Sequence, residues 1–182
     1  VGRRIPYLLR LHPTRAASEI QALLDAAEFP MMTWAQLRDL HLAGGVCKRP
    51  DLRAAVDHHG LGAHTKLVGM VSDRALVAYY QQATVFVFPS LYEGFGLPVL
   101  EAMGCGCPVI CSNASSLPEV AGDAAVLVDP QDGVRLAMEL ARVLMSPSLQ
   151  DELRAQGLAR ARAFSWDRTA AETVAVYRRL VG

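Results

Sequence analysis

The feature that most constrains the fold is a short apolar run that leads into two glycines and a proline. Residues 84–88 read Thr-Val-Phe-Val-Phe, which is typical of a strand buried on both faces of a parallel sheet. Gly94 and Gly96 follow, and glycine permits backbone conformations closed to other residues and a close approach of a ligand to the main chain. Pro98 suits the first turn of a helix, where its missing N–H is not needed. The stretch therefore predicts a strand whose carboxyl end meets a helix that begins near Leu97.

Strand and helix patterns alternate along most of the chain. We expect strands at 5–11, 37–43, 65–69, 84–88, 108–112 and 125–128. We expect helices at 16–27, 50–59, 72–82, from about 97, at 117–121, 134–145, 148–163 and 167–181. This alternation predicts an α/β fold: a Rossmann-like parallel sheet of about six strands, with helices on both faces and a helical C-terminal segment. The 182 residues fit one such domain, spanning 1–182.

Composition excludes several classes of partner. Lysine plus arginine and aspartate plus glutamate both number 18, so the net charge is zero and favours neither nucleic acid nor an anionic membrane. No apolar run is long enough to span a membrane, and the first residues lack a signal-peptide profile. The cysteines show no pairing framework, and Cys-x-Cys without nearby histidines is a poor zinc pattern. We therefore expect free buried thiols and a cytoplasmic location. The four cysteines are Cys47, Cys105, Cys107 and Cys111.

Two carboxylates flank the predicted helix start. The free amides of that start, with the positive end of the helix dipole, form a site for an anion such as a phosphate. Taken alone, Glu93 reads as a loop residue facing solvent and Glu101 as a helix-surface residue, but their joint context with the glycines and Pro98 favours binding. A carboxylate repels a diphosphate and accepts strong hydrogen bonds from hydroxyl groups. A nucleotide-sugar, with phosphates between two hydroxyl-rich sugars, satisfies both requirements.

Residues 85–130 also resemble a known family. The resemblance rests on Phe-Pro-Ser-Leu-Tyr-Glu-Gly-Phe-Gly-Leu-Pro-Val-Leu-Glu-Ala-Met at 88–103 and on Ser-Ser-Leu-Pro-Glu-Val at 115–120. These segments are similar to the donor-binding domain of retaining glycosyltransferases of family 4, which have the GT-B fold. The resemblance implies that this chain is one half of a GT-B fold.

The resemblance also implies roles for individual residues. Glu93 would be the catalytic candidate, contacting hydroxyls of the transferred hexose, and Glu101 would bind the ribose diol of the nucleotide. The backbone amides of three further residues would meet the donor sugar and the distal phosphate. Those residues are Phe95, Gly96 and Leu97.

The family usually places two cations near the first strand, where they neutralise the diphosphate. Arg10 matches the arginine that follows the strand, and Arg15 matches the arginine of an arginine-lysine turn, but Ala16 stands where the lysine is expected. Losing such a cation removes a contact to the charge that develops on the leaving group. Three readings stay open: Arg15 substitutes for the lysine, Lys48 reaches in, or the protein is a poor catalyst. Plain surface charge is the competing interpretation of both arginines.

The turn at 69–72 is similar to the family's nucleobase-binding turn. Val71 is therefore the candidate for contact with the base, although an ordinary strand-to-helix turn explains the sequence equally well. Ser115, Ser116 and Glu119 match a family stretch with a mainly structural role, so we leave them out of the site.

The function that the resemblance implies is transfer of a hexose from a nucleoside diphosphate sugar to an acceptor, with retention. We expect an amino-terminal acceptor domain or partner chain to lie outside this sequence, which begins at Val1 rather than Met. The isolated chain should then bind donor weakly and transfer little. Any membrane contact would come only through the missing half. We expect no cofactor and no divalent metal, because no Asp-x-Asp motif is present and the helix start with Arg10 can supply the positive charge.

Two alternatives belong to other classes. The first is a non-catalytic nucleotide-sugar-binding or assembly subunit, which Ala16 favours. The second is a glycoside hydrolase that uses Glu93 and Glu101 as acid and nucleophile. Hydrolases need two carboxyl groups that face each other across the scissile bond. Here an anion-binding helix start lies between the two glutamates, which makes the hydrolase the weaker hypothesis.

Overall fold

The computed structural model describes residues 5–10, 40–43, 50–58, 61–63 and 65–181. The predicted helix at 16–27 lies outside these residues, as do Arg15, Ala16, Cys47 and Lys48. The six strands are β1 (Ile5–Arg10), β2 (Leu40–Ala43), β3 (Thr65–Gly69), β4 (Ala83–Phe88), β5 (Val109–Ser112) and β6 (Val126–Val128). They form one parallel sheet in the order β3-β2-β1-β4-β5-β6, so the predicted six-stranded parallel sheet is confirmed.

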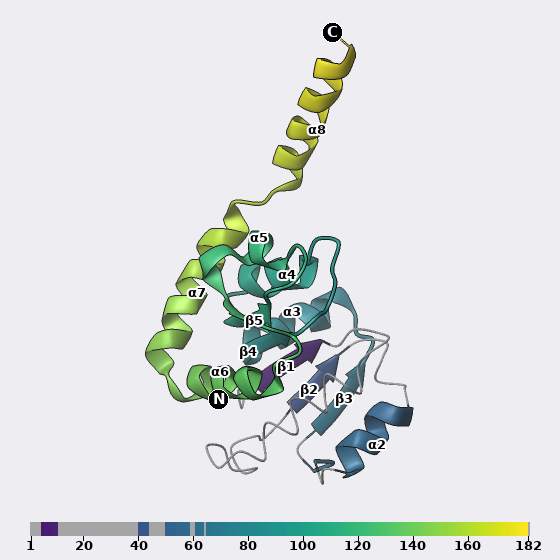
Figure 1. Cartoon of the computed structure of the whole chain (residues 1–182), viewed down its shortest axis with the longest axis vertical. Helices are drawn as coiled ribbons and strands as arrows, with labels where there is room; N and C mark the ends of the chain where they lie inside the picture. Colours follow the sequence, from purple (N-terminus) through teal and green to yellow (C-terminus); the bar gives the residue numbers. More distant parts are fainter. Residues whose placement is uncertain (1–4, 11–39, 44–49, 59–60, 64, 182) are drawn as a thin grey trace.

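The sheet grows in two directions from its centre. β2 and β3 lie on one side of β1, whereas β4, β5 and β6 lie on the other (Figure 1). Leu9 of β1 pairs with Val87 of β4, so the carboxyl ends of these two strands are neighbours. In open α/β sheets such a reversal of strand order leaves a crevice in which ligands bind. Arg10 ends β1 at this crevice, and the loop that contains Glu93 leaves β4 at the same edge.

The described helices match the predicted boundaries closely. They are α2 (Pro50–His58), α3 (Asp73–Gln82), α4 (Leu97–Gly104), α5 (Leu117–Ala121), α6 (Gly133–Met145), α7 (Pro147–Arg162) and α8 (Trp166–Val181). Caps explain several starts: Ser72 accepts a hydrogen bond from the amide of Ala75 at the start of α3, and Asp132 accepts one at the start of α6. The sequence did not predict the 3₁₀ turn η2 (Gly122–Ala124) between α5 and β6.

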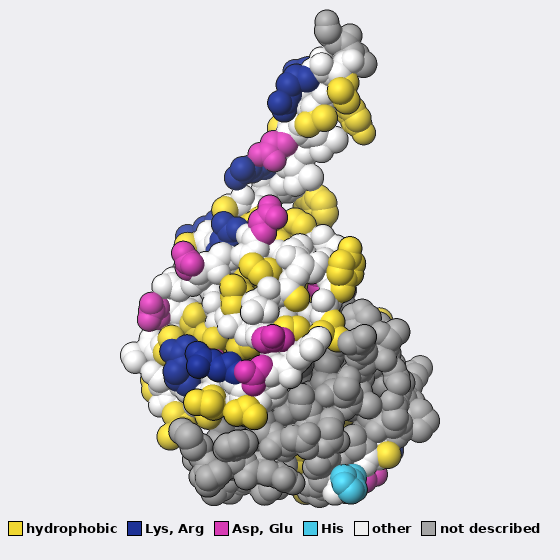
Figure 2. Space-filling view, in the orientation of Figure 1, with side chains coloured by type: hydrophobic (Ala, Val, Ile, Leu, Met, Phe, Trp, Pro, Cys, Tyr) yellow, Lys and Arg dark blue, Asp and Glu magenta, His cyan; other side chains and the backbone are white. Residues whose placement is uncertain are grey.

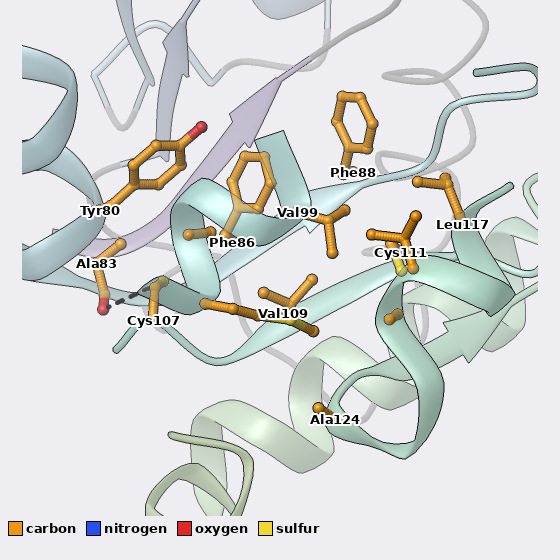
Figure 3. Packing of buried hydrophobic residues seen from close by; sticks show 14 residues of the cluster. Tyr80, Ala83, Phe86, Phe88, Val99, Cys107, Val109, Cys111, Leu117 and Ala124 are labelled. Carbon is orange, nitrogen blue, oxygen red and sulfur yellow. Dashed lines mark hydrogen bonds between the residues drawn. The ribbon is translucent and has the colours of Figure 1, made fainter. Parts of the chain in front are cut away.

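One face of the sheet packs against α3, α4 and α5. The ring of Tyr80 meets Phe86 edge-on at 5.2 Å, and Phe86 stacks with Phe88 at 5.8 Å (Figure 3). All three side chains are buried, together with Val99 of α4 and Leu117 of α5. This packing fixes α4 on the sheet, with its first turn at the crevice edge.

The opposite face of the sheet is also covered. Val85 and Val87 are buried, and they alternate with Phe86 and Phe88 along β4, so they point to the other face. Helix α6 contacts β4 and β6 and contributes the buried side chains of Leu136 and Leu140. Together with α3, α4 and α5 on the first face, α6 confirms the prediction that helices cover both faces.

Three cysteines after α4 are free thiols, as predicted. The Cys107 thiol is buried and donates to the Ala83 carbonyl at 3.8 Å (Figure 3). Burial raises the pKa of Cys107 and of Cys111 to about 12. The pKa of Cys105, which is only partly buried, is raised by burial and then by the charge of Glu101.

These raised thiol pKa values predict a loss of stability in alkali. The neutral thiols contribute fully below the ordinary thiol pKa of 9.0, and their contribution is lost as the pH rises from there toward about 12, because only the unfolded chain ionises them readily. We therefore expect the free energy of unfolding, from denaturant titration, to fall as the pH is raised through that window. Native Cys107 and Cys111 should also resist a thiol reagent that labels them in denaturant. Rapid labelling of both in the native chain would contradict the buried placement.

Helix α8 extends away from the sheet (Figure 1). Its charged side is solvated, and Arg168 pairs there with Glu172 at 2.7 Å. Large apolar side chains of the helix are also exposed, and yellow side chains line it in Figure 2. They are Trp166, Val174, Val176, Tyr177 and Leu180. Exposed apolar patches are typical of surfaces that another polypeptide covers. Within the described residues, no helix has the length and apolar character needed to cross a membrane.

Candidate functional site

The glycine turn between β4 and α4 is held in one conformation. Gly96 precedes α4 with a φ of 103°, a left-handed conformation that glycine adopts without strain. A Cβ atom at Gly96 would lie 2.5 Å from Cδ2 of Leu117, whereas a Cβ atom at Gly94 would meet nothing within 4 Å. Packing against α5 therefore explains Gly96, whereas the Cβ position at Gly94 faces open space.

Two serines from the segment before α5 fix the same turn. Ser115 and Ser116 both donate hydrogen bonds to the carbonyl oxygen of Glu93, at 2.6 and 3.0 Å. Ser116 also contacts the carbonyl oxygen of Phe95 at 2.9 Å. These contacts agree with the structural role predicted for the two serines. They hold the carbonyl groups of the turn from the α5 side. In the first turn of α4, Pro98 has no amide hydrogen and the Val99 amide donates to the Gly96 carbonyl at 3.0 Å.

Each of the two predicted acidic residues accepts a hydrogen bond from a hydroxyl group. The Ser90 hydroxyl lies 2.9 Å from Oε1 of Glu93, and Ser90 is itself held by the Ser112 hydroxyl, which donates to its carbonyl oxygen. The Tyr80 hydroxyl lies 3.1 Å from Oε2 of Glu101, which stands in the second turn of α4. An ionised carboxylate has about four acceptor positions, so it can accept hydrogen bonds from more than one hydroxyl group at once.

A pocket of about 580 Å³ lies over the outer side of α4. It is lined by Phe95, Leu97, Leu100, Glu101, Gly104, Ala161, Phe164, Ser165, Trp166 and Thr169. Its volume is within the usual range for small-molecule sites, and its lining combines an apolar surface with one carboxylate. The pocket therefore brings together Phe95, Leu97 and Glu101, three of the residues predicted from the sequence to bind the donor.

The far wall of this pocket was not predicted from the sequence. Phe164 meets Phe95 edge-on at 6.0 Å, and Trp166 is exposed at the start of α8. The signal was two aromatic residues within three positions, between two charged helices. In the sequence this pattern indicates only a helix boundary, because nothing local shows that the junction folds back beside α4.

The remaining predicted residues are distributed around the sheet edge. Val71 is half-buried after β3, the edge strand, and β3 is three strand spacings, about 14 Å, from β4. Neither Val71 nor Glu93 lines the pocket. Only the backbone of Arg10 is described, and Arg15 lies outside the described residues. In the described part of the chain, no three histidine, cysteine, aspartate or glutamate side chains are grouped to hold a metal ion, and the expectation that none is needed stays a prediction.

These features define a class of protein. A parallel sheet with a central reversal of strand order, and a glycine turn that opens a helix at that crevice, belong to the Rossmann-like domains that build GT-B glycosyltransferases. The chain belongs to the family described as glycosyl transferases group 1, whose pattern matches residues 23–160. The predicted resemblance to glycosyltransferases is thereby confirmed.

Individual relatives agree with this assignment. O-antigen chain mannosyltransferase B of Escherichia coli is 45% identical over 115 residues, which are 63% of this chain and 30% of that protein. Sucrose-phosphate synthase from Thermosynechococcus elongatus is 31% identical and superposes with a TM-score of 0.79, over 99% of this chain and 46% of that structure. Anabaena Alr3699/HepE, in complex with UDP and glucose, shares the fold at 18% identity, with a TM-score of 0.75 over 96% of this chain and 49% of its own. This chain thus spans less than half the length of these three proteins.

Proposed function

We propose that this chain is the donor-binding half of a retaining hexosyltransferase that takes a nucleoside diphosphate sugar as donor. The observation that carries the proposal is the start of α4 at the central crevice, with Glu93 before it and Glu101 in its second turn. The amide end of a helix favours a diphosphate, and the two carboxylates favour the hydroxyl groups on either side of it.

Each group has one task in this proposal. Glu93 accepts hydrogen bonds from the hexose, and Glu101 accepts them from the ribose diol. The amides of Phe95, Gly96 and Leu97 bind the sugar and the distal phosphate. As the glycosidic bond breaks, negative charge develops on the departing diphosphate, and fixed donors aimed at that charge stabilise the transition state. Arg10 and Arg15 add positive charge in this proposal, and the base lies along the sheet edge toward Val71.

A second polypeptide unit supplies the acceptor in this proposal. The chain spans 30% of the Escherichia coli mannosyltransferase, and the exposed apolar side chains of α8 offer a surface for such a unit. That relative's name also makes a mannosyl group the favoured hexose for this chain. The free thiols support the cytoplasmic location that the sequence predicts.

Calorimetry on the 182-residue chain tests the proposal. The ligands are UDP, GDP, UDP-glucose and GDP-mannose, each titrated into the millimolar range, with mannose and glucose alone as controls. We expect one nucleotide series to bind weakly, with the nucleotide-sugar binding more tightly than either free sugar. The proposal fails if no nucleotide binds, or if a free sugar binds as well as its nucleotide derivative.

A second candidate function is supported by Ala16, which stands where the family has a lysine beside the diphosphate. In that alternative the chain binds the nucleotide-sugar without catalysing its transfer. Restoring the cation with Ala16→Lys distinguishes the two readings: a catalyst that lacks one cation should gain activity in the presence of an acceptor-binding partner. A non-catalytic subunit should gain affinity for the diphosphate only. The glycoside hydrolase finds no support in the family to which the chain belongs.

A further inference from the structure

The two candidate acids share a feature that the proposed function does not by itself require. Each carboxylate accepts a hydrogen bond from a hydroxyl group on a buried residue of the sheet domain. Tyr80 is 1% exposed and holds Glu101, while Ser90 is 2% exposed and holds Glu93. We propose that Tyr80 and Ser90 are positioning residues that fix the two carboxylates for the ribose and for the hexose, respectively. This inference rests on the proposed function.

A hydroxyl donor suits this task because it orients a carboxylate without cancelling its charge. The arrangement at Glu93 contrasts with that at Glu139 on α6. Its buried carboxylate is paired with Arg135 at 2.5 Å and with Arg142 at 2.6 Å, which satisfies both oxygens with cations. A neutral hydroxyl occupies one acceptor position and leaves a charged group that can still accept bonds from sugar hydroxyls.

The hydroxyl of Tyr80 is placed by core packing. Its ring lies edge-on to Phe86 at 5.2 Å, and it is among the largest fully buried side chains. Figure 3 shows the ring among the core side chains, with its oxygen at the outer end. A long, flexible glutamate loses rotamer entropy when it is ordered, so a rigid partner that orders Glu101 before binding lowers the cost of capturing the ribose.

The hydroxyl of Ser90 is placed by the strand beside it. The Ser112 hydroxyl, at the end of β5, donates to the carbonyl oxygen of Ser90 and ties the end of β4 to its neighbour. The single proton of Ser90 has two acceptors within reach: Oε1 of Glu93 at 2.9 Å and the carbonyl oxygen of Tyr92 at 3.3 Å. The carboxylate is closer and charged, so it takes the stronger bond.

The two positioning residues should have separable effects on binding. Tyr80→Phe removes one hydroxyl and keeps the ring, so it should weaken the nucleoside diphosphate and the nucleotide-sugar alike, by about three- to tenfold. Ser90→Ala should weaken the nucleotide-sugar by a similar factor and leave the nucleoside diphosphate unchanged, because Glu93 meets only the hexose. Calorimetry with UDP and UDP-glucose, or GDP and GDP-mannose, measures this difference on the 182-residue chain.

A control separates positioning from loss of stability. Ser146→Ala removes the hydroxyl that accepts a hydrogen bond from the Leu149 amide at the start of α7, so it should lower the melting temperature without changing either affinity. If the unsubstituted chain binds neither nucleotide series, the proposed function fails and the inference falls with it. If that chain binds but Tyr80→Phe and Ser90→Ala bind as it does, the inference alone is overturned. Equal weakening of both ligands by Ser90→Ala would overturn the assignment of Ser90 to the hexose.

Discussion

Replacing Gly96 with alanine is expected to lower the free energy of unfolding by about 2–5 kcal/mol. Two costs add in this variant. The left-handed backbone at φ 103° strains any residue that has a Cβ atom, and that atom would lie 2.5 Å from Cδ2 of Leu117. Relief by moving the turn would displace the first amides of α4, so nucleotide binding should be lost together with stability. Denaturant titration and calorimetry measure the two effects.

Gly94→Ala is the matched control for this prediction. Gly94 lies two residues earlier in the same turn, is exposed, and has open space where its Cβ would be built. The φ angle of Gly94 is not positive, so its backbone conformation is open to alanine. We expect a change in unfolding free energy within about 0.5 kcal/mol. Equal stability of the Gly94 and Gly96 variants would contradict the described conformation of the turn.

Replacing Glu101 with glutamine should weaken nucleotide binding by about 1.5–3 kcal/mol, which corresponds to roughly 10- to 150-fold in Kd. Glutamine keeps the size of the side chain and one carbonyl oxygen, but it loses the charge that strengthens hydrogen bonds from the ribose diol. The loss should be the same for the nucleoside diphosphate and for the nucleotide-sugar, because both contain the ribose. Titration of both ligands into the variant measures it.

Glu119→Gln is the matched control for the Glu101 variant. Glu119 is an exposed helical glutamate on α5, and Arg160 donates a hydrogen bond to its backbone carbonyl at 2.5 Å, a contact that the substitution leaves intact. Both substitutions remove one negative charge, so a general electrostatic effect on a polyanionic ligand would appear in both. We expect the Glu119 variant to bind as the unsubstituted chain does. A similar change in the two variants would contradict a direct role for Glu101.

Much of the fold was predictable because local patterns and tertiary packing agree. The run at 84–88 is buried on both faces of the sheet, as its continuous apolar character indicated, and Pro98 lies in the first turn of α4. The predicted helix at 72–82 is present as α3, with Ser72 as its cap. The second predicted strand is described from Leu40 to Ala43, and its residues 37–39 lie outside the described part of the chain.

The candidate site was predictable only in part. The Glu93 to Glu101 stretch could be found because its chemistry lies within nine consecutive residues. Glu101 is held by the hydroxyl of Tyr80, which lies 21 residues earlier in the chain. Glu93 is held by the hydroxyl of Ser90, three residues earlier. The local sequence pattern predicts neither contact. Phe164 reaches Phe95 only because α7 packs along α4. Long-range packing of this kind is decided by the assembled core.

The most direct test of the central claim is a map of backbone amide shifts in the nitrogen-15 NMR spectrum of the 182-residue chain, recorded as a nucleotide-sugar is added. A diphosphate held at the start of α4 should move the amide signals of Phe95, Gly96 and Leu97 first and furthest, and the Glu101 amide with them. The same map with the nucleoside diphosphate alone should retain the shifts at the helix start. Shifts that saturate elsewhere on the chain while these amides stay in place would contradict the claim.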